Sequence, residues 1–235
     1  MKTKEMGARS AVYLLGVILL GAGISLNTEA ALGVSPVISI AYNLSQILHI
    51  SIGTMSFLYY CFLIVLQFLL LGKKAELLLL MQVLAGFFTS IFIQLFDNVL
   101  RVPEEMSMRL IFLLLAIFLT GLGASLTIVM RLIPNPADAL AKTIGDILRK
   151  DFGFGKNLLD ATCLVIALII SFSFGKGFLG IGVGSIVAVV LTGRVVALCH
   201  PYSEEIYQLI ENRGRENSPP LSSIFSYGLN VKYHQ

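Results

Sequence analysis

Ionisable side chains within or beside apolar segments are the residues of this sequence best suited to chemistry, because charge is costly in lipid and marks substrate or ion contacts. These side chains are Glu29, Asp97, Arg131, Asp160 and Arg194. Four of them stand near the ends of apolar runs, where interfacial water solvates them. Asp160 instead lies one turn inside a run, four residues after Lys156, a spacing that pairs opposite charges on a helix. Asp160 is therefore the strongest single candidate for a substrate or ion contact.

Two shorter segments each begin with a polar residue followed by proline, namely Ser35-Pro36 and Asn135-Pro136. A capping side chain directly before proline is typical of a helix start. We expect short helices over 36–48 and 136–150, because a bilayer span takes about 20 residues. If the two short helices dip into the membrane, the positive ends of their dipoles would face a polar solute. If they lie flat on the membrane surface, they would be interfacial helices. The sequence leaves both arrangements open.

The two short segments that begin at Pro36 and Pro136 contribute the remaining residues of the candidate site. Asp138 lies in the first turn of the second short helix, close behind Asp160 as a candidate contact. We predict that a polar solute or ion is bound by four residues: Ser35, Asn135, Asp138 and Asp160.

Nothing in the sequence indicates an enzyme, a metal site or a cofactor. The cysteines at 61, 163 and 199 lie in apolar runs without CxxC spacing, and none of the three histidines has a second ligand nearby in the sequence. There is no phosphate-binding GxxxxGK[ST] and no HExxH motif. We expect no enzymatic activity, no metal and no cofactor.

The composition places the chain in a membrane. Of its 235 residues, 56% are hydrophobic and 13% charged, which is outside the range of soluble proteins. The net charge of +3 is spread over loops and forms no basic block, so we expect the lipid bilayer and not a nucleic acid as partner.

Six segments are long and apolar enough to cross a bilayer. They are residues 11–31, 54–71, 75–97, 108–130, 156–174 and 179–199, the first read as an uncleaved span. An eight-span alternative would leave Lys142 within lipid, at a cost of about 2.5–3.5 kcal/mol. Six spans with both termini in the cytoplasm leave only Arg101, Arg109 and Lys176 on the outer side, in line with the positive-inside rule.

A glycine-rich pattern occurs twice, with an offset of 100 positions. The recurring residues are Gly21, Gly23, Ser25, Leu26, Leu32 and Pro36, answered by Gly121, Gly123, Ser125, Leu126, Leu132 and Pro136. Each copy holds three spans, so the second must enter the membrane from the opposite face. The glycines at 21, 23, 121 and 123 are expected to let the first spans of the two copies pack closely.

The predicted fold class is all-α: a polytopic bundle of six transmembrane helices plus two short amphipathic or re-entrant helices, arranged as two inverted repeats of three spans. Residues 1–200 would form one transmembrane domain, with repeats over about 11–97 and 108–199. Residues 201–235 would form a cytoplasmic tail with a short amphipathic helix.

Several motifs in order resemble the YczE/YyaS/YitT family of bacterial integral membrane proteins. They are Gly33-Val34-Ser35-Pro36, Ile52-Gly53-Thr54, Pro136-Ala137-Asp138, Phe152-Gly153-Phe154-Gly155 and Gly180-Ile181-Gly182-Val183-Gly184-Ser185. Where such proteins commonly have Trp-Asp after the first Ser-Pro, this chain has Val37-Ile38, so only Asp138 keeps an acidic side chain at this place. We expect no soluble C-terminal domain of the kind found in the YitT branch, so the resemblance is greater to the YczE-like branch. The resemblance implies a bacterial cytoplasmic membrane.

We therefore predict a small secondary transporter or permease component for a small polar solute or ion. The alternative is a non-transporting membrane scaffold or regulatory protein that acts through a cytoplasmic partner. A polar cavity between the two halves would favour transport, and a dry interface would favour the scaffold. The sequence gives no indication of an oligomeric state.

Overall fold

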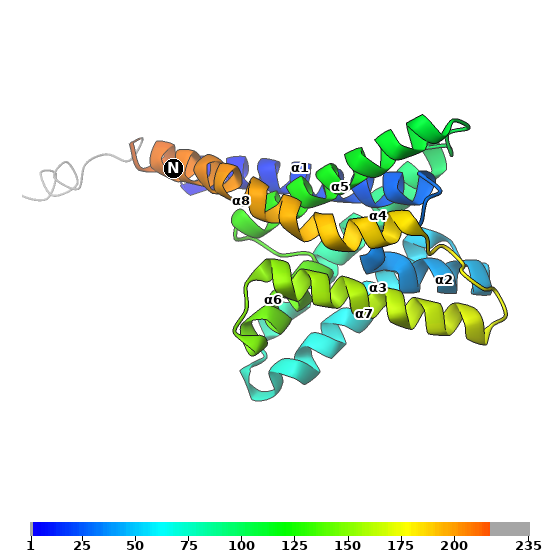
Figure 1. Ribbon diagram of the computed structural model, residues 1–235. Helices are drawn as coiled ribbons and strands as arrows, with labels where there is room; N and C mark the ends of the chain where they lie inside the picture. Colours follow the sequence, from blue (N-terminus) through cyan, green and yellow to red (C-terminus); the bar gives the residue numbers. More distant parts are fainter. Residues whose placement is uncertain (1, 217–235) are drawn as a thin grey trace, which may run out of the picture.

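The structure is a computed structural model that describes residues 2–216, and within them the chain is entirely helical (Figure 1). The helices are α1 (Lys2–Glu29), α2 (Ser39–Leu48), α3 (Ile52–Leu71), α4 (Gln82–Val99), α5 (Met106–Val129), α6 (Pro136–Leu148), α7 (Phe152–Ser173) and α8 (Val183–Glu216). Short 3₁₀ turns precede α2 and α4: η1 (Pro36–Ile38), η2 (Gly72–Lys74) and η3 (Leu77–Met81). The all-α prediction is confirmed.

Six of the helices are long and apolar enough to cross a membrane, as predicted: α1, α3, α4 together with the end of η3, α5, α7 and α8. They carry large apolar side chains on the outside of the bundle, including Phe62, Leu114 and Ile169. Such a surface is suited to lipid and unsuited to water. The molecule is a polytopic helical membrane protein.

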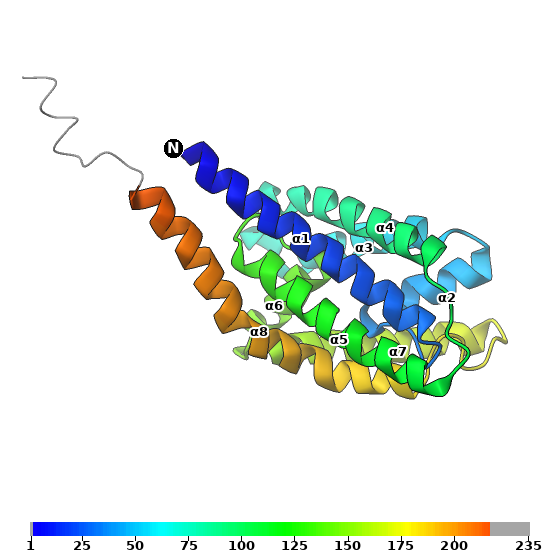
Figure 2. The same ribbon diagram turned by 90° about the horizontal axis from the view of Figure 1, so that it is seen from above.

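The bundle has two ends, which we call the N-terminal face and the opposite face. α1 begins at the N-terminal face and ends at Glu29 on the opposite face, while α5 runs back alongside it (Figures 1 and 2). Loops at the N-terminal face join α3 to α4, α5 to α6 and α6 to α7. The loops at the opposite face join α1 to α2, α2 to α3, α4 to α5 and α7 to α8.

The antiparallel pair α1 and α5 approaches closely at glycines. A Cβ atom added to Gly23 would lie 2.6 Å from the backbone nitrogen of Thr120, and one added to Gly123 would lie 2.6 Å from that of Leu20. Glycine is required at both positions because the neighbouring atoms belong to backbone. Gly21 and Gly121 instead meet α4 and α8, at Phe92 and Val195 respectively. The four glycines therefore allow close packing, but only two of them lie between α1 and α5.

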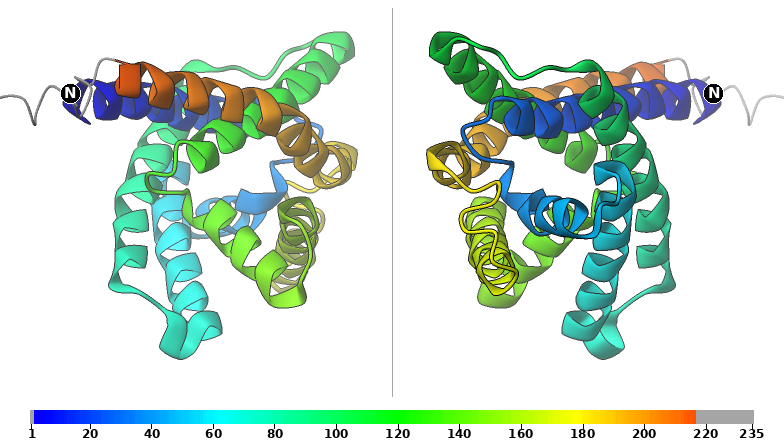
Figure 3. Two further views of the ribbon diagram at one scale, coloured as in Figure 1. Left: turned by 90° about the vertical axis from the view of Figure 1, so that its left-hand side faces the viewer. Right: turned by 90° about the vertical axis from the view of Figure 1, so that its right-hand side faces the viewer.

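The two short helices lie between the long helices α3 and α7 and not on the outside of the bundle. Figure 3 shows α6 between α3 and α7 from one end and α2 in the same place from the other end. α2 ends at Leu48 and α3 begins at Ile52, so α2 returns to the face at which α1 ended. The equivalent turn from α6 to α7 returns to the N-terminal face. Neither short helix crosses the bundle, which is the re-entrant arrangement.

Corresponding positions in the two halves share unusual backbone geometry. Ala31 and Arg131, each just past a long helix, have φ of 53° and 52°. His49 and Arg149, each closing a short helix, both have φ of 56°. Non-glycine residues seldom adopt this left-handed conformation, so its occurrence at two pairs of positions with the same spacing reflects matching chain paths.

The structure differs from the sequence prediction at the C-terminal end. Residues 203–213 do not form a separate amphipathic helix; they continue α8, which runs without a break to Glu216 and contains Pro201. This extension packs on the N-terminal face, where Tyr207 contacts the end of α5 at Val129 and Met130. The predicted tail beyond residue 216 lies outside the described residues.

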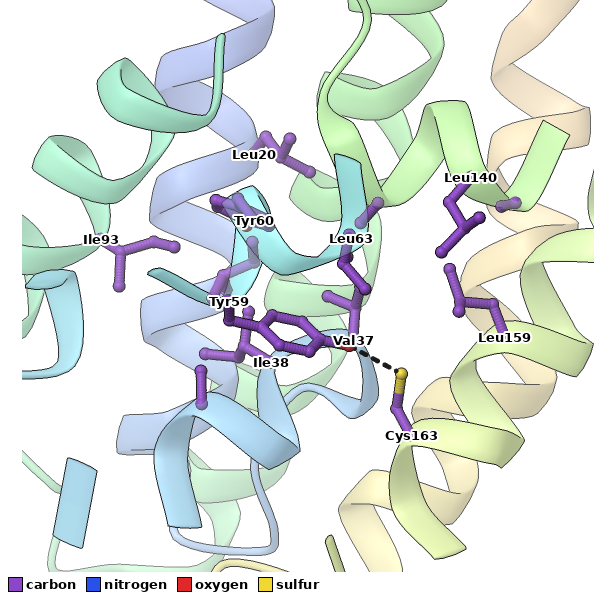
Figure 4. Packing of buried hydrophobic residues seen from close by; sticks show 14 of the residues in the cluster. Leu20, Val37, Ile38, Tyr59, Tyr60, Leu63, Ile93, Leu140, Leu159 and Cys163 are labelled. Carbon is purple, nitrogen blue, oxygen red and sulfur yellow. Dashed lines mark hydrogen bonds between the residues drawn. The ribbon is translucent and has the colours of Figure 1, made fainter. Parts of the chain in front are cut away.

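One apolar core joins both halves of the chain (Figure 4). It contains Val37 and Ile38 from η1 and Ala137 and Leu140 from α6, together with Tyr60 of α3 and Leu159 of α7. The hydroxyl of Tyr59 lies 3.1 Å from the Sγ of Cys163 within this core. Both short helices thus begin in the middle of the bundle.

Candidate functional site

Three buried charged side chains, Asp138, Lys156 and Asp160, meet between α6 and α7, and we call them the charge cluster. The Lys156 Nζ lies 3.1 Å from Asp160 Oδ1 and 3.7 Å from Asp138 Oδ1. Asp138 is 3% exposed, Lys156 is 2% exposed and Asp160 is 1% exposed. The structure therefore brings together the predicted site residues Asp138 and Asp160, because both are ion-paired with Lys156.

Close packing of α6 on α7 creates this arrangement. Gly155 leaves no room for a side chain, because a Cβ there would overlap the backbone oxygen of Ala141 and lie 2.9 Å from the nitrogen of Gly145. The next residue, Lys156, is thereby held against α6. Asp160 follows one turn later on the same face of α7.

The charge cluster contains two carboxylates and one ammonium group, so it carries a net charge of −1 when all three are ionised. Asp138 Oδ2 is buried and has no hydrogen-bond partner within the described residues. Removing an ion pair from water already costs free energy. A further carboxylate oxygen without a partner raises the free-energy cost of burying this site. Such a site is poised to bind a positively charged group or a proton.

Asn135 fixes the start of α6, and both polar atoms of its amide are bonded to protein groups. Its Oδ1 accepts a hydrogen bond from the nitrogen of Ala137 at 3.0 Å, which caps the helix, and its Nδ2 donates to Thr89 Oγ1 at 3.0 Å. The cap orients α6 so that Asp138, in its first turn, faces α7. In this structure Asn135 supports the site and does not open into it.

Ser35 occupies the equivalent place before η1 and is buried, but its side chain does not cap the helix. Among the described residues, no hydrogen bond or ion pair connects Ser35 with Asn135, Asp138 or Asp160. The loop before it is held by α8 instead, because Ser185 Oγ donates to the oxygen of Val34 at 2.8 Å. Of the four predicted residues, the structure links Asp138 and Asp160 directly.

A chain of neutral polar side chains that sequence reasoning missed lies beside the charge cluster. Gln82 Nε2 donates to Gln67 Oε1 at 2.9 Å, and Gln67 Nε2 donates to Thr143 Oγ1 at 2.8 Å. All three residues are buried. The signal in the sequence was a glutamine near the end of an otherwise apolar span, which is as informative in lipid as a charge.

A cavity of about 310 Å³ connects this polar chain with the N-terminal face. Asp138 lies in its wall. The other polar residues lining it are Gln67, Gln82, Thr127, Arg131, Lys142, Thr143 and Asp146. It lies between helices of both halves, because α3 and the start of α4 form one side while α5 and α6 form the other.

A second cavity, of about 600 Å³, lies at the opposite face and contains none of the charge cluster in its wall. Polar residues lining it include Thr28, Glu29, Tyr42, Gln46 and Asp97. The walls of the two cavities use equivalent positions: residues 28, 31, 32, 34, 42 and 46 line the larger cavity, and 128, 131, 132, 134, 142 and 146 line the smaller. The bundle thus has a polar cavity at each face.

Six apolar helices, a lipid-facing surface and a buried charged site place the chain in the class of integral membrane proteins with a polar interior. The chain belongs to the family of unknown function DUF6198, whose model matches residues 7–201. It is similar to the uncharacterized protein YyaS of Bacillus subtilis (strain 168), at 28% identity over 206 residues covering 86% of this chain and 97% of that protein.

A second relative is the uncharacterized membrane protein YczE of the same organism, 27% identical over 205 residues that cover 86% of this chain and 90% of that protein. No solved structure matches the chain. The resemblance to YyaS and YczE is confirmed, and the link with the YitT branch stays a prediction.

Proposed function

We propose that the protein is a small secondary transporter, or a permease component, for a small polar solute or ion. The charge cluster carries this proposal: a buried, incompletely paired carboxylate lies in the wall of a cavity between the two halves of the bundle. A scaffold would have no need of such a site, because a buried ion pair contributes little stability compared with apolar packing.

We propose further that the halves α1–α4 and α5–α8 are inverted repeats. The antiparallel α1 and α5, the matched contacts of Gly23 and Gly123, and the shared left-handed residues support this relation. Inverted repeats place a solute site near the middle of the membrane and let the two halves exchange conformations. In the present arrangement Asp138 borders the cavity at the N-terminal face, so access is from that face.

The distribution of basic residues supports a cytoplasmic N-terminal face. Loops and helix ends there carry Lys73, Arg131, Lys142, Arg149 and Lys150, whereas the loops of the opposite face carry Arg101, Arg109 and Lys176. By the positive-inside rule the face richer in lysine and arginine is cytoplasmic. The structure would then be the inward-open state of a protein of the bacterial cytoplasmic membrane.

Reconstitution tests the transport proposal. Purified protein in liposomes is screened for uptake of radiolabelled small cations, zwitterions and neutral polar solutes, and Asp138→Asn is compared with Asp151→Asn. Asp151 is an exposed acid at the start of α7 and lies in neither cavity wall. Uptake that is lost in Asp138→Asn and kept in Asp151→Asn supports the proposal. Uptake equal in both variants would remove the charge cluster from the transport path.

One observation favours the scaffold alternative. The extension of α8 beyond residue 200 projects from the bundle at the N-terminal face (Figures 1 and 2). A cytoplasmic partner could bind it there. A stoichiometric partner recovered by crosslinking, and lost on truncation after residue 200, would support this function; a bundle that transports without the extension would argue against it.

A further inference from the structure

We propose that the charge cluster is an exchangeable proton site, with Asp138 as the residue that gains and loses the proton. This inference rests on the proposed transport function and deepens it, because the proton would then be the coupling ion. The step is a simple binding: one proton adds to one carboxylate oxygen of Asp138, the net charge of the cluster changes from −1 to 0, and nothing is oxidised or reduced.

The imbalance of charge is the first argument. Lys156 offers one positive charge to two carboxylates, all three buried. A net charge in a low-dielectric interior is strongly disfavoured and is usually removed by protonation. A single proton makes the cluster neutral without any rearrangement of the helices.

The geometry selects Asp138 over Asp160 as the proton acceptor. The ammonium group lies 3.1 Å from Asp160 Oδ1 but 3.7 Å from Asp138 Oδ1, so Asp160 is the better compensated carboxylate. Asp138 also has the unpartnered Oδ2 among the described residues, and it lines the cavity through which a proton would arrive.

The other charged and titratable groups around Asp138 do not act as the proton acceptor in its place. From α3, Tyr60 faces Asp138, and Tyr59 lies near Asp160. From α6, Lys142 and Asp146 line the cavity with opposite charges, and from the end of α5 Arg131 is paired with Glu204 at 3.2 Å. Cys163 of α7 is engaged with Tyr59. Among the described neighbours of Asp138 named here, only Lys156 and Asp160 are buried and ion-paired with a member of the cluster.

A proton fits the site better than a metal cation. Hard cations require several oxygen ligands at once, and within the described part of the chain no three His, Cys, Asp or Glu residues are grouped closely enough to hold a metal ion. The ammonium group of Lys156 would also repel a metal ion placed between the carboxylates. A proton needs only the one free oxygen.

Infrared difference spectroscopy of the purified protein tests the site without any transported solute. Acidification between pH 9 and pH 4 should produce the carbonyl stretching band of a protonated buried carboxyl group, and D₂O should shift that band to lower frequency. We expect Asp138→Asn to lose the band and Asp151→Asn to keep it. Asp138→Glu, which retains a carboxyl group, should keep it with a displaced midpoint and also shows that the position tolerates substitution.

Each other outcome overturns the proposal. A wild-type spectrum without a titrating buried carboxyl band would show that the cluster is a permanent ion pair, while solute uptake in liposomes would leave the transport proposal standing. A band that survives in Asp138→Asn and disappears in Asp160→Asn would assign the proton to the other carboxylate. A titrating band that does not shift in D₂O would show that the band does not arise from a protonated carboxyl group.

Discussion

At the scale of single residues, Lys156 determines the character of the site. It is the one positive group between two carboxylates, and its neighbour Gly155 holds it against α6. A buried charge without its partner is far more costly than the complete pair. The cluster is therefore more sensitive to the loss of the lysine than to the loss of either acid.

Replacement of Lys156 should measure this sensitivity. We expect Lys156→Met to lower the free energy of unfolding by about 3–5 kcal/mol, because two carboxylates then remain buried without a counter-charge. The double change Lys156→Met with Asp160→Asn should recover a large part of the loss.

Thermal unfolding in detergent can be followed with a thiol-reactive dye in a Cys61→Ala, Cys199→Ala background, because these two thiols are partly exposed and Cys163 is buried in the folded protein. Equal midpoints for the single and double variants would contradict the expectation.

Sequence reasoning reached part of the site because part of it is local. Lys156 and Asp160 are one helical turn apart, and their pairing follows from spacing alone. Asp138 joins them only through the packing of α6 on α7, which depends on the glycines at 145 and 155. The solute contact of Asn135 stays a prediction; the structure shows that its amide oxygen caps α6. Contacts between helices depend on how the helices pack, and this packing cannot be predicted from the sequence of any one helix.

At the scale of helices, the seam between α1 and α5 is the most extensive contact between the two halves. We expect Gly123→Val to destabilise the protein by about 1–3 kcal/mol, since a larger residue would press on the backbone of Leu20. Gly7→Val is the matched control, because a Cβ there has nothing within 4 Å. A similar fall in unfolding temperature for both variants would contradict the role of the seam, since helix propensity alone favours valine over glycine.

The extension of α8 is held by an aromatic contact with two arginines. The guanidinium groups of Arg9 and Arg131 lie 5.1 Å and 4.7 Å from the centre of the Tyr207 ring, and each contact contributes about 0.5–1 kcal/mol. We expect Tyr207→Ala to increase hydrogen exchange over residues 203–212, with Tyr202→Ala as control because Tyr202 is 69% exposed. Unchanged exchange in Tyr207→Ala would mean that other contacts hold the extension.

This extension was also the main error of prediction at this scale. The sequence predicted a separate short helix after the last span, yet α8 continues through Pro201. A proline removes one backbone hydrogen bond and strains the preceding turn, but water near the end of a span can satisfy the freed carbonyl group. The six spans and the two proline-led helices were predicted correctly, because their signals are the length of the apolar runs and the proline at each short helix start.

At the scale of the whole molecule, the two cavities imply a definite sidedness. In a cysteine-free background, Gln46→Cys and Asp146→Cys occupy equivalent positions in the larger and smaller cavities. We expect an impermeant maleimide to label Gln46→Cys in intact cells and Asp146→Cys only after the membrane is opened. Labelling of both from the same side would overturn the inverted arrangement.

The charge cluster belongs to only one half of the bundle. At the positions equivalent to Asp138, Lys156 and Asp160, the first half has Ile38, Ser56 and Tyr60, all of them buried. In a dimer of two identical chains inserted in opposite directions, every substitution appears twice, and a buried lysine would bring a second one with it. Joining the two copies in one polypeptide removes that constraint. Under the proposed inverted repeat, the chain would hold a single charged site off its symmetry axis, and its two proposed end states would differ in energy.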